Sequence, residues 1–380
     1  MLNLSKEPCL QLNAHPARIW HRLSSCPDKN PLAPFKSPRP LLVSPHHTDT
    51  PEHQMIIAGI DEAGYGPLLG PMVVSATAFD LPDAAFDAAL DGQVPCLWKL
   101  LQAAVARKAP IKKGRVLVAD SKIVHAQRDG LKLLERGVLA FARAAGLCGE
   151  DITDRALVEL LGGPEHGLNH HPWYGAAVAV PSLADPGDLS IAANMVGTAL
   201  ASSGVTVACL RTRVVSESLF NQMVSATQNK ATAAVAVTLG HLLHLHTHFG
   251  DRGLVVGIDK QGGRDFYRDL LLRWFPDAQL KVLNESAKSS GYILREGPRH
   301  TLVYFREKGD RGWFATALAS MICKYLRELC MHAFNAWWCG RVEGLRPTAG
   351  YYGDGTRWLM EVEPHLIRLG IERAGFVRCR

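Results

Sequence analysis

Short apolar segments alternate with amphipathic stretches over most of the chain. Residues 55–60 and 71–79 are apolar and are joined by a turn rich in Gly and Pro, which predicts two strands that pair as a hairpin. Similar apolar runs predict further strands at residues 115–119, 205–215, 254–259 and 301–305. Helices are predicted at residues 130–145, 216–248, 264–274 and 312–338. Strands that alternate with helices indicate an α/β layer fold.

Two segments depart from this alternation. Nine of the 22 prolines fall within the first 51 residues, among Ser, His and Asn, so we expect residues 1–54 to be a disordered extension or the product of a misplaced start codon. Residues 146–204 contain Gly, Pro and His clusters and are expected to form an insertion of uncertain shape. The main domain is therefore expected to span residues 55–345 and to be followed by a C-terminal segment, residues 346–380.

Composition excludes several classes of protein. Hydrophobic residues make up 47% of the chain and charged residues 21%, as in a soluble globular protein. No apolar stretch is long enough to cross a bilayer, and the N-terminus has no continuous hydrophobic region, so we expect a cytoplasmic protein. The nine cysteines are odd in number and include no Cys-x-x-Cys pair, which disfavours a disulfide framework and a Cys-rich zinc site.

The net charge of +6 is unevenly distributed. Residues 55–259 hold 16 Lys and Arg against 19 Asp and Glu, whereas residues 260–380 hold 20 against 13. A basic C-terminal third suits a protein that binds a phosphate backbone along one face. A solvated helical face rich in arginine is the alternative, and charge alone does not decide between them.

Four acids occupy positions that suggest one shared site. Asp61 and Glu62 follow the first predicted strand, Asp259 ends a central one, and Asp310 precedes the long helix near the C-terminus. Carboxylates at adjacent strand ends converge on one edge of a sheet, and their oxygens suit Mg²⁺ or Mn²⁺. Two such ions about 3.5–4 Å apart catalyse phosphoryl displacement by activating water and stabilising the leaving oxygen. A helix cap or a loop salt bridge is the alternative for any single acid, but four consistent positions favour a metal site.

The motifs around these acids resemble those of type 2 ribonuclease H, the ribonuclease HII family. Residues 59–71, GIDEAGYGPLLGP, resemble the family's opening motif position by position. Weaker resemblances are found at Asp120-Ser121-Lys122, at Lys308-Gly309-Asp310 with the following residues 319–324, and at residues 350–356. The resemblance covers about residues 55–360.

The resemblance implies a ribonuclease H-like mixed sheet flanked by helices, with a C-terminal helical region. It also implies an endonuclease that hydrolyses the RNA strand of RNA–DNA hybrids. We expect this protein to be a monomer. Two Mg²⁺ or Mn²⁺ ions would be held by Asp61, Glu62, Asp259 and Asp310, with Asp61 bridging both. The residues that would contact nucleic acid are Gly64, Tyr65, Gly66, Lys122, Tyr351 and Tyr352, the last two in the C-terminal segment.

The departures from the family pattern concern substrate recognition more than metal binding. Tyr65 stands where the family has Arg, Lys260 follows Asp259 where the family has Gly, and Cys323 replaces an Ala. In the tightest alignment Asp354 takes the place of the aromatic residue that packs on the sugar. Two alternatives therefore stay open: a nuclease of the same fold that acts on another structured nucleic acid, and a non-catalytic nucleic-acid-binding relative.

Three further features have competing interpretations. Lys260 and Arg264 are expected to contact a phosphate or the substrate strand, with a salt bridge to Asp265 or Asp269 as the alternative. The histidines 241, 244, 246 and 248 form a cluster that is more typical of a helix C-terminus than of a metal site. Residues 170–174, HHPWY, are expected to form a local hydrophobic plug rather than to stack on bases.

Overall fold

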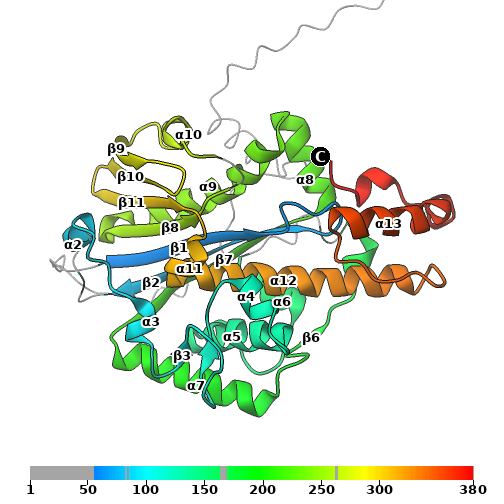
Figure 1. The fold of residues 1–380 in the computed structure, drawn as a ribbon, viewed down its shortest axis with the longest axis horizontal. Helices are drawn as coiled ribbons and strands as arrows, with labels where there is room; N and C mark the ends of the chain where they lie inside the picture. The colour runs from blue at the N-terminus through cyan, green and yellow to red at the C-terminus, as the bar shows by residue number, and fades with distance from the viewer. Residues whose placement is uncertain are drawn as a thin grey trace, which may run out of the picture.

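A seven-stranded mixed sheet forms the centre of the molecule (Figure 1). The computed structural model describes residues 55–81, 84, 86–162, 168, 170–261 and 264–379, so the expected extension, residues 1–54, lies outside the described residues. In spatial order the strands are β7 (Thr206–Val215), β2 (Met72–Leu81), β1 (Met55–Ala63), β8 (Leu254–Asp259), β11 (Arg299–Arg306), β10 (Ser289–Glu296) and β9 (Gln279–Glu285). β1, β8 and β11 run parallel to one another, and the neighbouring pairs are antiparallel.

Helices cover both faces of this sheet, and β1 alternates its side chains between them. Ile56, Ala58 and Ile60 pack in the core beneath α8 (Glu217–Thr227) and α9 (Lys230–Phe249). Met55 and Ile57 belong to the core of the opposite face, which α5 (Gly130–Ala144), α7 (Pro186–Ser202) and α12 (Phe314–Cys339) cover (Figure 1). The mixed sheet flanked by helices that the sequence predicted is therefore confirmed.

Helix α12 crosses β1 at a glycine. A Cβ added to Gly59 would lie 2.0 Å from the backbone nitrogen of Thr316 and 2.3 Å from the carbonyl carbon of Ala315. The Thr316 hydroxyl also donates to the Gly257 carbonyl of β8, at 2.8 Å. The helix backbone therefore contacts the sheet backbone directly, an approach that only glycine permits.

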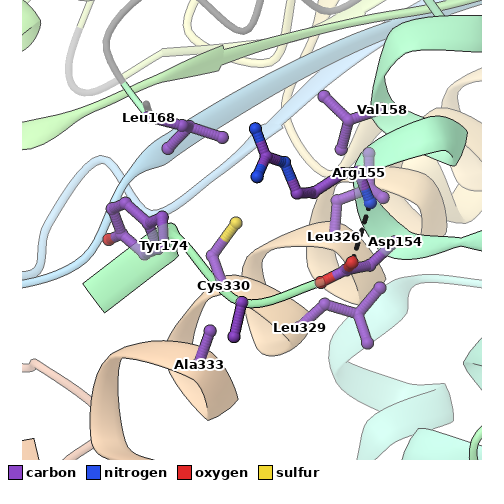
Figure 2. Close-up of a pocket in the computed structure, with 10 residues that line it drawn as sticks. Asp154, Arg155, Val158, Leu168, Tyr174, Leu326, Leu329, Cys330 and Ala333 are labelled. Carbon is purple, nitrogen blue, oxygen red and sulfur yellow. Dashed lines mark hydrogen bonds between the residues drawn. The ribbon is translucent and has the colours of Figure 1, made fainter. Parts of the chain in front are cut away.

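The described part of the segment at residues 146–204 contributes to the core. It contains α6 (Asp154–Leu160) and α7, and α7 packs on α5 with Leu189, Ala192 and Val196 buried. A cavity of about 30 Å³, room for about one water, lies between α6 and α12 (Figure 2), and none of the four predicted catalytic acids lines it.

Two sequence predictions about elements were wrong. The helix expected over residues 216–248 is two helices, because Gln228 has a left-handed backbone (φ 51°) and Asn229 caps α9 by accepting from the Thr232 amide at 2.9 Å. Ser216 does cap α8, as predicted. The strand expected at residues 115–119 is only β4 (Val116–Leu117), which pairs with β3 (Val105–Ala106) outside the main sheet.

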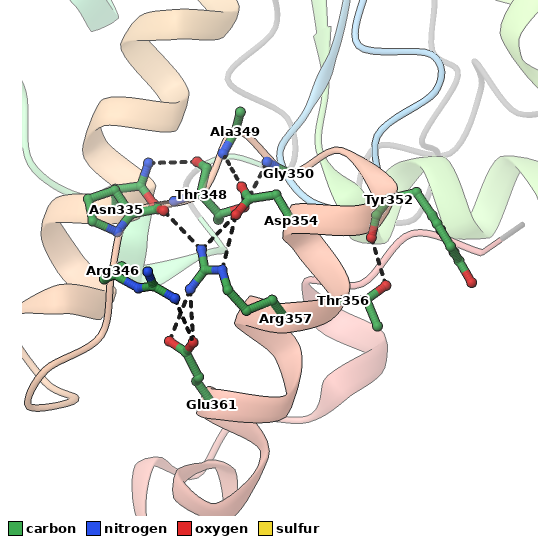
Figure 3. A network of polar contacts seen from close by, with 11 residues as sticks. Asn335, Arg346, Thr348, Ala349, Gly350, Tyr352, Asp354, Thr356, Arg357 and Glu361 are labelled. Atoms are coloured by element: carbon green, nitrogen blue, oxygen red, sulfur yellow. Dashed lines mark hydrogen bonds and ion pairs between the residues drawn. The ribbon is translucent and has the colours of Figure 1, made fainter.

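The C-terminal residues form a helical region on the end of α12. It contains α13 (Tyr352–Val362) and α14 (Leu366–Leu369), and Arg357 joins Asp354 at 2.7 Å to Glu361 at 3.0 Å (Figure 3). Trp173 and Tyr174 are buried in the apolar cluster beneath this region, which confirms the predicted hydrophobic plug.

The remaining elements are short. They are α2 (Phe86–Leu90), α3 (Leu97–Leu100), α4 (Ser121–His125), β5 (Ile152–Thr153), β6 (Ala179–Val180), α10 (Arg268–Trp274), α11 (Gly309–Gly312), and 3-10 turns at Pro172–Tyr174, Gly250–Arg252, Glu363–His365 and Arg373–Gly375. α10 and α12 begin a few residues later than expected. Among the described residues, every helix is too short or too polar to span a bilayer.

Candidate active site

The four predicted acids lie at the edge of the sheet where β1, β8 and β11 end. Asp61 and Glu62 belong to the end of β1, and Asp259 is the last residue of β8. The parallel register pairs Ile60 with Ile258, so Asp61 and Asp259 follow at the same level. Asp310 lies in α11, four residues after β11, which is also parallel to β8. The strand ends thus bring the acids to one edge, as the sequence predicted.

Burial and the charges of neighbouring carboxylates raise the pKa of each of these acids. Burial raises the pKa of Asp61 well above its ordinary value, and the negative charges of Glu62, Asp259 and Asp310 add to the effect. Burial raises the pKa of Glu62 to about 7, against the opposing hydrogen bond from Gln261.

The other two acids respond in the same way. Burial, followed by the charges of Asp120 and Asp259, raises the pKa of Asp310 to about 7. The pKa of Asp259 is raised chiefly by burial and is lowered in part by its hydrogen bond from Gly309. The cluster is therefore a set of carboxyl groups that are costly to ionise together without a cation.

Hydrogen bonds hold three of these acids in place. An Asp61 carboxylate oxygen accepts from the Glu62 amide at 2.7 Å, and an Asp259 oxygen accepts from the Gly309 amide at 2.7 Å. Gln261 donates to Glu62 at 3.0 Å and to the Thr238 hydroxyl of α9 at 2.7 Å. Gln261 is thus a positioning residue that links Glu62 to the helix above it. Sequence reasoning missed this residue.

Asp120 is a fifth carboxyl group at this edge. It caps α4 by accepting from the Lys122 amide at 2.9 Å, and it pairs with Arg311 at 3.1 Å. Its charge and a hydrogen bond to Asp310 both raise the pKa of Asp310. The sequence analysis singled out this motif only for Lys122. The signal for Asp120 was present in the same three residues.

Lys122, the predicted phosphate contact, lies near the acids. Its side chain is exposed, and its positive charge lowers the pKa values of Glu62, Asp259 and Asp310. The ammonium group is therefore within electrostatic reach of all three carboxyl groups. A cation in this position can also contact a phosphate that approaches the cluster.

The acids fit a divalent cation by the kind of donor they offer. Within the part of the chain that the structure describes, no three His, Cys, Asp or Glu side chains converge closely enough to form a complete metal site. The donors at the sheet edge are nevertheless carboxylate oxygens, the ligands that Mg²⁺ and Mn²⁺ prefer. Binding of such an ion would relieve the repulsion that raises their pKa values.

The loop after β1 is held from below by a buried arginine. Arg378, 1% exposed, donates to the carbonyl of Gly64 and, at 2.8 Å, to the carbonyl of Tyr65. The N–H of a trans peptide points away from its C=O, so the amides of Tyr65 and Gly66 point away from Arg378. Around Gly66 there is open space, with no atom within 4 Å of an added Cβ. Sequence reasoning missed Arg378.

Tyr65, in this loop, and Tyr351 and Tyr352, in the C-terminal segment, are also predicted to contact the substrate. The Lys230 ammonium lies 5.2 Å from the centre of the Tyr65 ring, so a cation is present beside the position where the family has Arg. Tyr351 and Tyr352 are 51% and 55% exposed. The guanidinium of the buried Arg327 lies 5.5 Å from the Tyr351 ring, and it donates to Ala349 at 3.1 Å.

Lys260 forms the salt bridge that was the alternative to a phosphate contact. Its ammonium donates to Asp265 at 2.9 Å, to the Ala287 carbonyl at 3.1 Å and to the Ser286 carbonyl, and its side chain is 8% exposed. The expected role for Lys260 in substrate binding is therefore corrected. Arg264 instead lines a hollow of about 380 Å³ together with Tyr65 and Gln261.

The clustered histidines of α9 have separate partners. His246 lies between the Thr301 hydroxyl at 2.8 Å and Glu296 at 3.0 Å. His241 contacts the Val74 carbonyl at 3.2 Å, and His244 contacts Arg211 at 2.9 Å. His241 and His246 are buried, so these two side chains are not the surface feature that such a cluster near a helix C-terminus was expected to be.

The chain is similar in sequence to bacterial ribonucleases HII. It is 28% identical to ribonuclease HII of Xylella fastidiosa (strain M12) over 172 residues, which cover 35% of this chain and 73% of the relative. It is 37% identical to ribonuclease HII of Azoarcus sp. (strain BH72) over 92 residues, 23% of this chain and 41% of the relative. The chain is a divergent ribonuclease HII-like protein. No family model matches it.

Solved structures similar to this ribonuclease HII-like protein include three ribonucleases H. One is ribonuclease HII from Archaeoglobus fulgidus in complex with PCNA (TM-score 0.35, 15% identity, 86% of this chain and 94% of that chain). Another is ribonuclease H2 from Pyrococcus horikoshii OT3 (TM-score 0.36, 12% identity, 85% and 92%). A third is Bst-RNase HIII in complex with Mn²⁺ (TM-score 0.36, 14% identity, 87% and 67%). Because these TM-scores and identities are low, the structural similarity adds no support to the similarity in sequence.

The raised pKa values predict that the metal-free ribonuclease HII-like protein loses stability as the pH rises. A carboxyl group whose pKa is raised on folding stabilises the folded state below its unfolded pKa, and this contribution is lost as the pH rises through the folded pKa. For Glu62 and Asp310 the window runs from their ordinary values of 4.5 and 3.8 to about 7. The free energy of unfolding, measured with urea in the presence of a chelator, should fall across that range.

A variant isolates this effect from other titrating groups. Asp310→Asn cannot ionise at residue 310, so its stability should fall less than that of the wild type over the same pH range. Equal pH dependence in the two proteins would show that Asp310 is not crowded by other carboxylates.

Proposed function

We propose that this ribonuclease HII-like protein is a metal-dependent endonuclease that hydrolyses the RNA strand of RNA–DNA hybrids. The observation that carries the proposal is the placement of Asp61, Glu62, Asp259 and Asp310 at one sheet edge, where burial and neighbouring carboxylates raise their pKa values. Such a cluster is costly unless it binds cations. The sequence similarity to ribonuclease HII supports the reaction class. We also propose that the protein acts as a monomer in the cytoplasm.

The four acids, Asp61, Glu62, Asp259 and Asp310, would hold two Mg²⁺ or Mn²⁺ ions. When bound, such ions activate water and stabilise the leaving oxygen of an in-line phosphoryl displacement, here to give a 3′-hydroxyl and a 5′-phosphate. Gln261 would keep the Glu62 carboxylate oriented through its 3.0 Å hydrogen bond. Lys122 would bind a phosphate next to the scissile bond, since its exposed ammonium already faces the acids.

Selectivity for RNA would come from the loop after β1. Arg378 turns the carbonyls of Gly64 and Tyr65 inward, and this leaves the amides of Tyr65 and Gly66 facing outward. Outward amides can donate to a 2′-hydroxyl, the group that distinguishes RNA from DNA. The rings of Tyr351 and Tyr352, which are 51% and 55% exposed, would pack on a sugar.

A panel of labelled duplexes with Mn²⁺ tests the proposal. We expect cleavage of an RNA–DNA hybrid and of a duplex with one embedded ribonucleotide, and no cleavage of all-DNA or all-RNA duplexes. Tyr65 replaces the family's Arg, so discrimination between the single ribonucleotide and the longer RNA stretch should be weak, and Tyr65→Arg should sharpen it. Glu62→Gln is the inactive control.

Other results would identify the two alternatives. Cleavage of all-DNA as readily as of hybrid would refute the ribonuclease function and favour a nuclease for another nucleic acid. Binding of duplexes without cleavage, together with a melting temperature that Mn²⁺ does not raise, would indicate a non-catalytic relative.

A further inference from the structure

A strongly basic loop lies next to the acid cluster. Residues 107–115, RKAPIKKGR, contain five Lys and Arg residues and no acid, in a chain whose whole net charge is +6. We call this segment the basic loop. It connects β3 to β4, and the side chains of Arg107, Lys108, Lys112 and Lys113 are exposed. None of the sequence motifs described above includes this loop.

The basic loop is anchored at both ends. The parallel pairing of Val105 with Val116 holds its base together. Arg107 lies over the Trp98 ring, 4.5 Å from its centre, and donates to the Arg311 carbonyl directly after Asp310. These contacts fix the charged loop beside α11, the element that carries one of the proposed metal ligands.

The basic loop and the acids share one hollow. A hollow of about 600 Å³ is lined by Arg107 and Lys108 from the loop and by Asp120, Asp310 and Arg311 from the acid cluster and its neighbours. Residues of α9 line the hollow that contains Tyr65 and Arg264, whereas Ile123 of α4 lines this one. The helices α9 and α4 lie on opposite faces of the sheet (Figure 1). The acids therefore lie between two hollows that each contain basic side chains.

The charges of the basic loop are not compensated locally. Over the described ranges of the chain, the side chains of Lys108, Lys112 and Lys113 form no ion pair and no hydrogen bond. Like charges at this density repel one another, and a polyanion with regularly spaced charges relieves the repulsion by releasing its counterions. A solvated surface loop is the alternative, but it gives no reason for the charges to border the catalytic hollow.

We propose that the basic loop, residues 107–115, binds the phosphate backbone of a nucleic-acid duplex on the Asp310 side of the acid cluster. This inference rests on the proposed function, because it takes the substrate to be a duplex whose scissile phosphate lies at the acids. The duplex would extend from the Tyr65 hollow across the acids to the basic loop. The loop would contribute affinity and register without contributing sequence preference, because it contacts phosphates.

Equilibrium binding of a fluorescent RNA–DNA hybrid in the presence of a chelator tests this proposal, since no cleavage occurs without metal. The variant is the triple substitution Lys108→Ala, Lys112→Ala and Lys113→Ala. It should weaken binding by about tenfold or more at about 0.1 M salt, and the slope of log K against log salt should become shallower by about two to three, since each phosphate contact contributes about 0.9. A thermal melt checks that the variant is folded.

The matched control removes the same charge from the far edge of the sheet. The control is the triple substitution Arg273→Ala, Lys281→Ala and Arg295→Ala, whose wild-type residues are exposed on α10, β9 and β10. It should leave the affinity and the salt slope near the wild-type values. Wild-type affinity in the loop variant, or equal weakening in the control, would overturn the proposal. If the loop variant cleaves the hybrid and binds it normally, the proposed role of the basic loop is rejected but the nuclease function is not. If binding depends on the loop but the wild type does not cleave the hybrid, the nuclease function is rejected but the role of the loop is not.

Discussion

Asp61→Asn is expected to abolish hydrolysis and, at the same time, to stabilise the metal-free protein. Asp61 is 5% exposed and is surrounded by the charges of Glu62, Asp259 and Asp310. The amide keeps the shape and the oxygen that accepts from the Glu62 amide, at 2.7 Å, but it carries no charge. Loss of a proposed metal ligand should reduce cleavage by about 10³-fold or more. Relief of repulsion should raise the free energy of unfolding by about 1–2 kcal/mol near neutral pH.

The measurement pairs cleavage rates with urea unfolding, in chelator and in Mn²⁺. Mn²⁺ should stabilise the wild type more than the variant, because only the wild type keeps all four proposed ligands. Asp354→Asn is the matched control. Hydrogen bonds from Thr348 at 2.5 Å and Arg357 at 2.7 Å satisfy that carboxylate, so its loss should destabilise the protein. If both variants were destabilised, Asp61 would not be held in a repulsive cluster.

Gly59→Ala is expected to cause a large loss of stability, about 3 kcal/mol or more. The added methyl would lie 2.0 Å from the Thr316 backbone nitrogen, so either α12 or β1 must move. Backbone cannot give way as a flexible side chain does. The same movement would displace Asp61, two residues further along β1. Urea unfolding measures the effect, and wild-type stability would show that α12 does not approach the strand so closely.

Gly66→Ala adds the same methyl group seven residues later and separates packing from recognition. No atom lies within 4 Å of the added Cβ, and neither glycine has a positive φ, so stability should stay within about 0.5 kcal/mol of the wild type. If the substrate strand approaches this backbone, as we propose, kcat/KM on the hybrid should fall. Unchanged kcat/KM would argue against an approach at Gly66.

The elements predicted correctly from the sequence are those whose pattern of apolar residues follows their burial in the fold. β1 and β8 are buried on both faces and therefore appear as continuous apolar runs with an acid at the end. β9 was missed because most of its residues are exposed at the edge of the sheet. β10 was missed with it. The break between α8 and α9 was missed because the apolar spacing continues across Gln228, although Asn229 is a good N-cap residue.

The residues of the candidate site also differ in whether the sequence alone could predict them. Asp61 and Asp259 could be predicted because their positions follow from the strands that carry them. The Asp120–Arg311 pair and the Gln261–Glu62 hydrogen bond join residues 191 and 199 positions apart, so only the tertiary fold determines them. Lys260 was predicted to contact the substrate because the sequence does not show the β9–β10 turn beside it. That turn provides two carbonyl acceptors that hold the Lys260 ammonium next to Asp265.

The contact of Arg378 with Gly64 has a consequence for how the protein is made. The two residues are 314 positions apart, and at about 5–20 residues per second the ribosome needs about 15–60 seconds to synthesise the chain between them. During that interval the loop after β1 exists without the guanidinium that orients its carbonyls, and for most of it Asp61 and Glu62 exist without Asp310. Contacts of such high sequence separation form late in folding, because the intervening chain must first be ordered. A nascent chain that already carries the opening motif would therefore not yet have an organised active site.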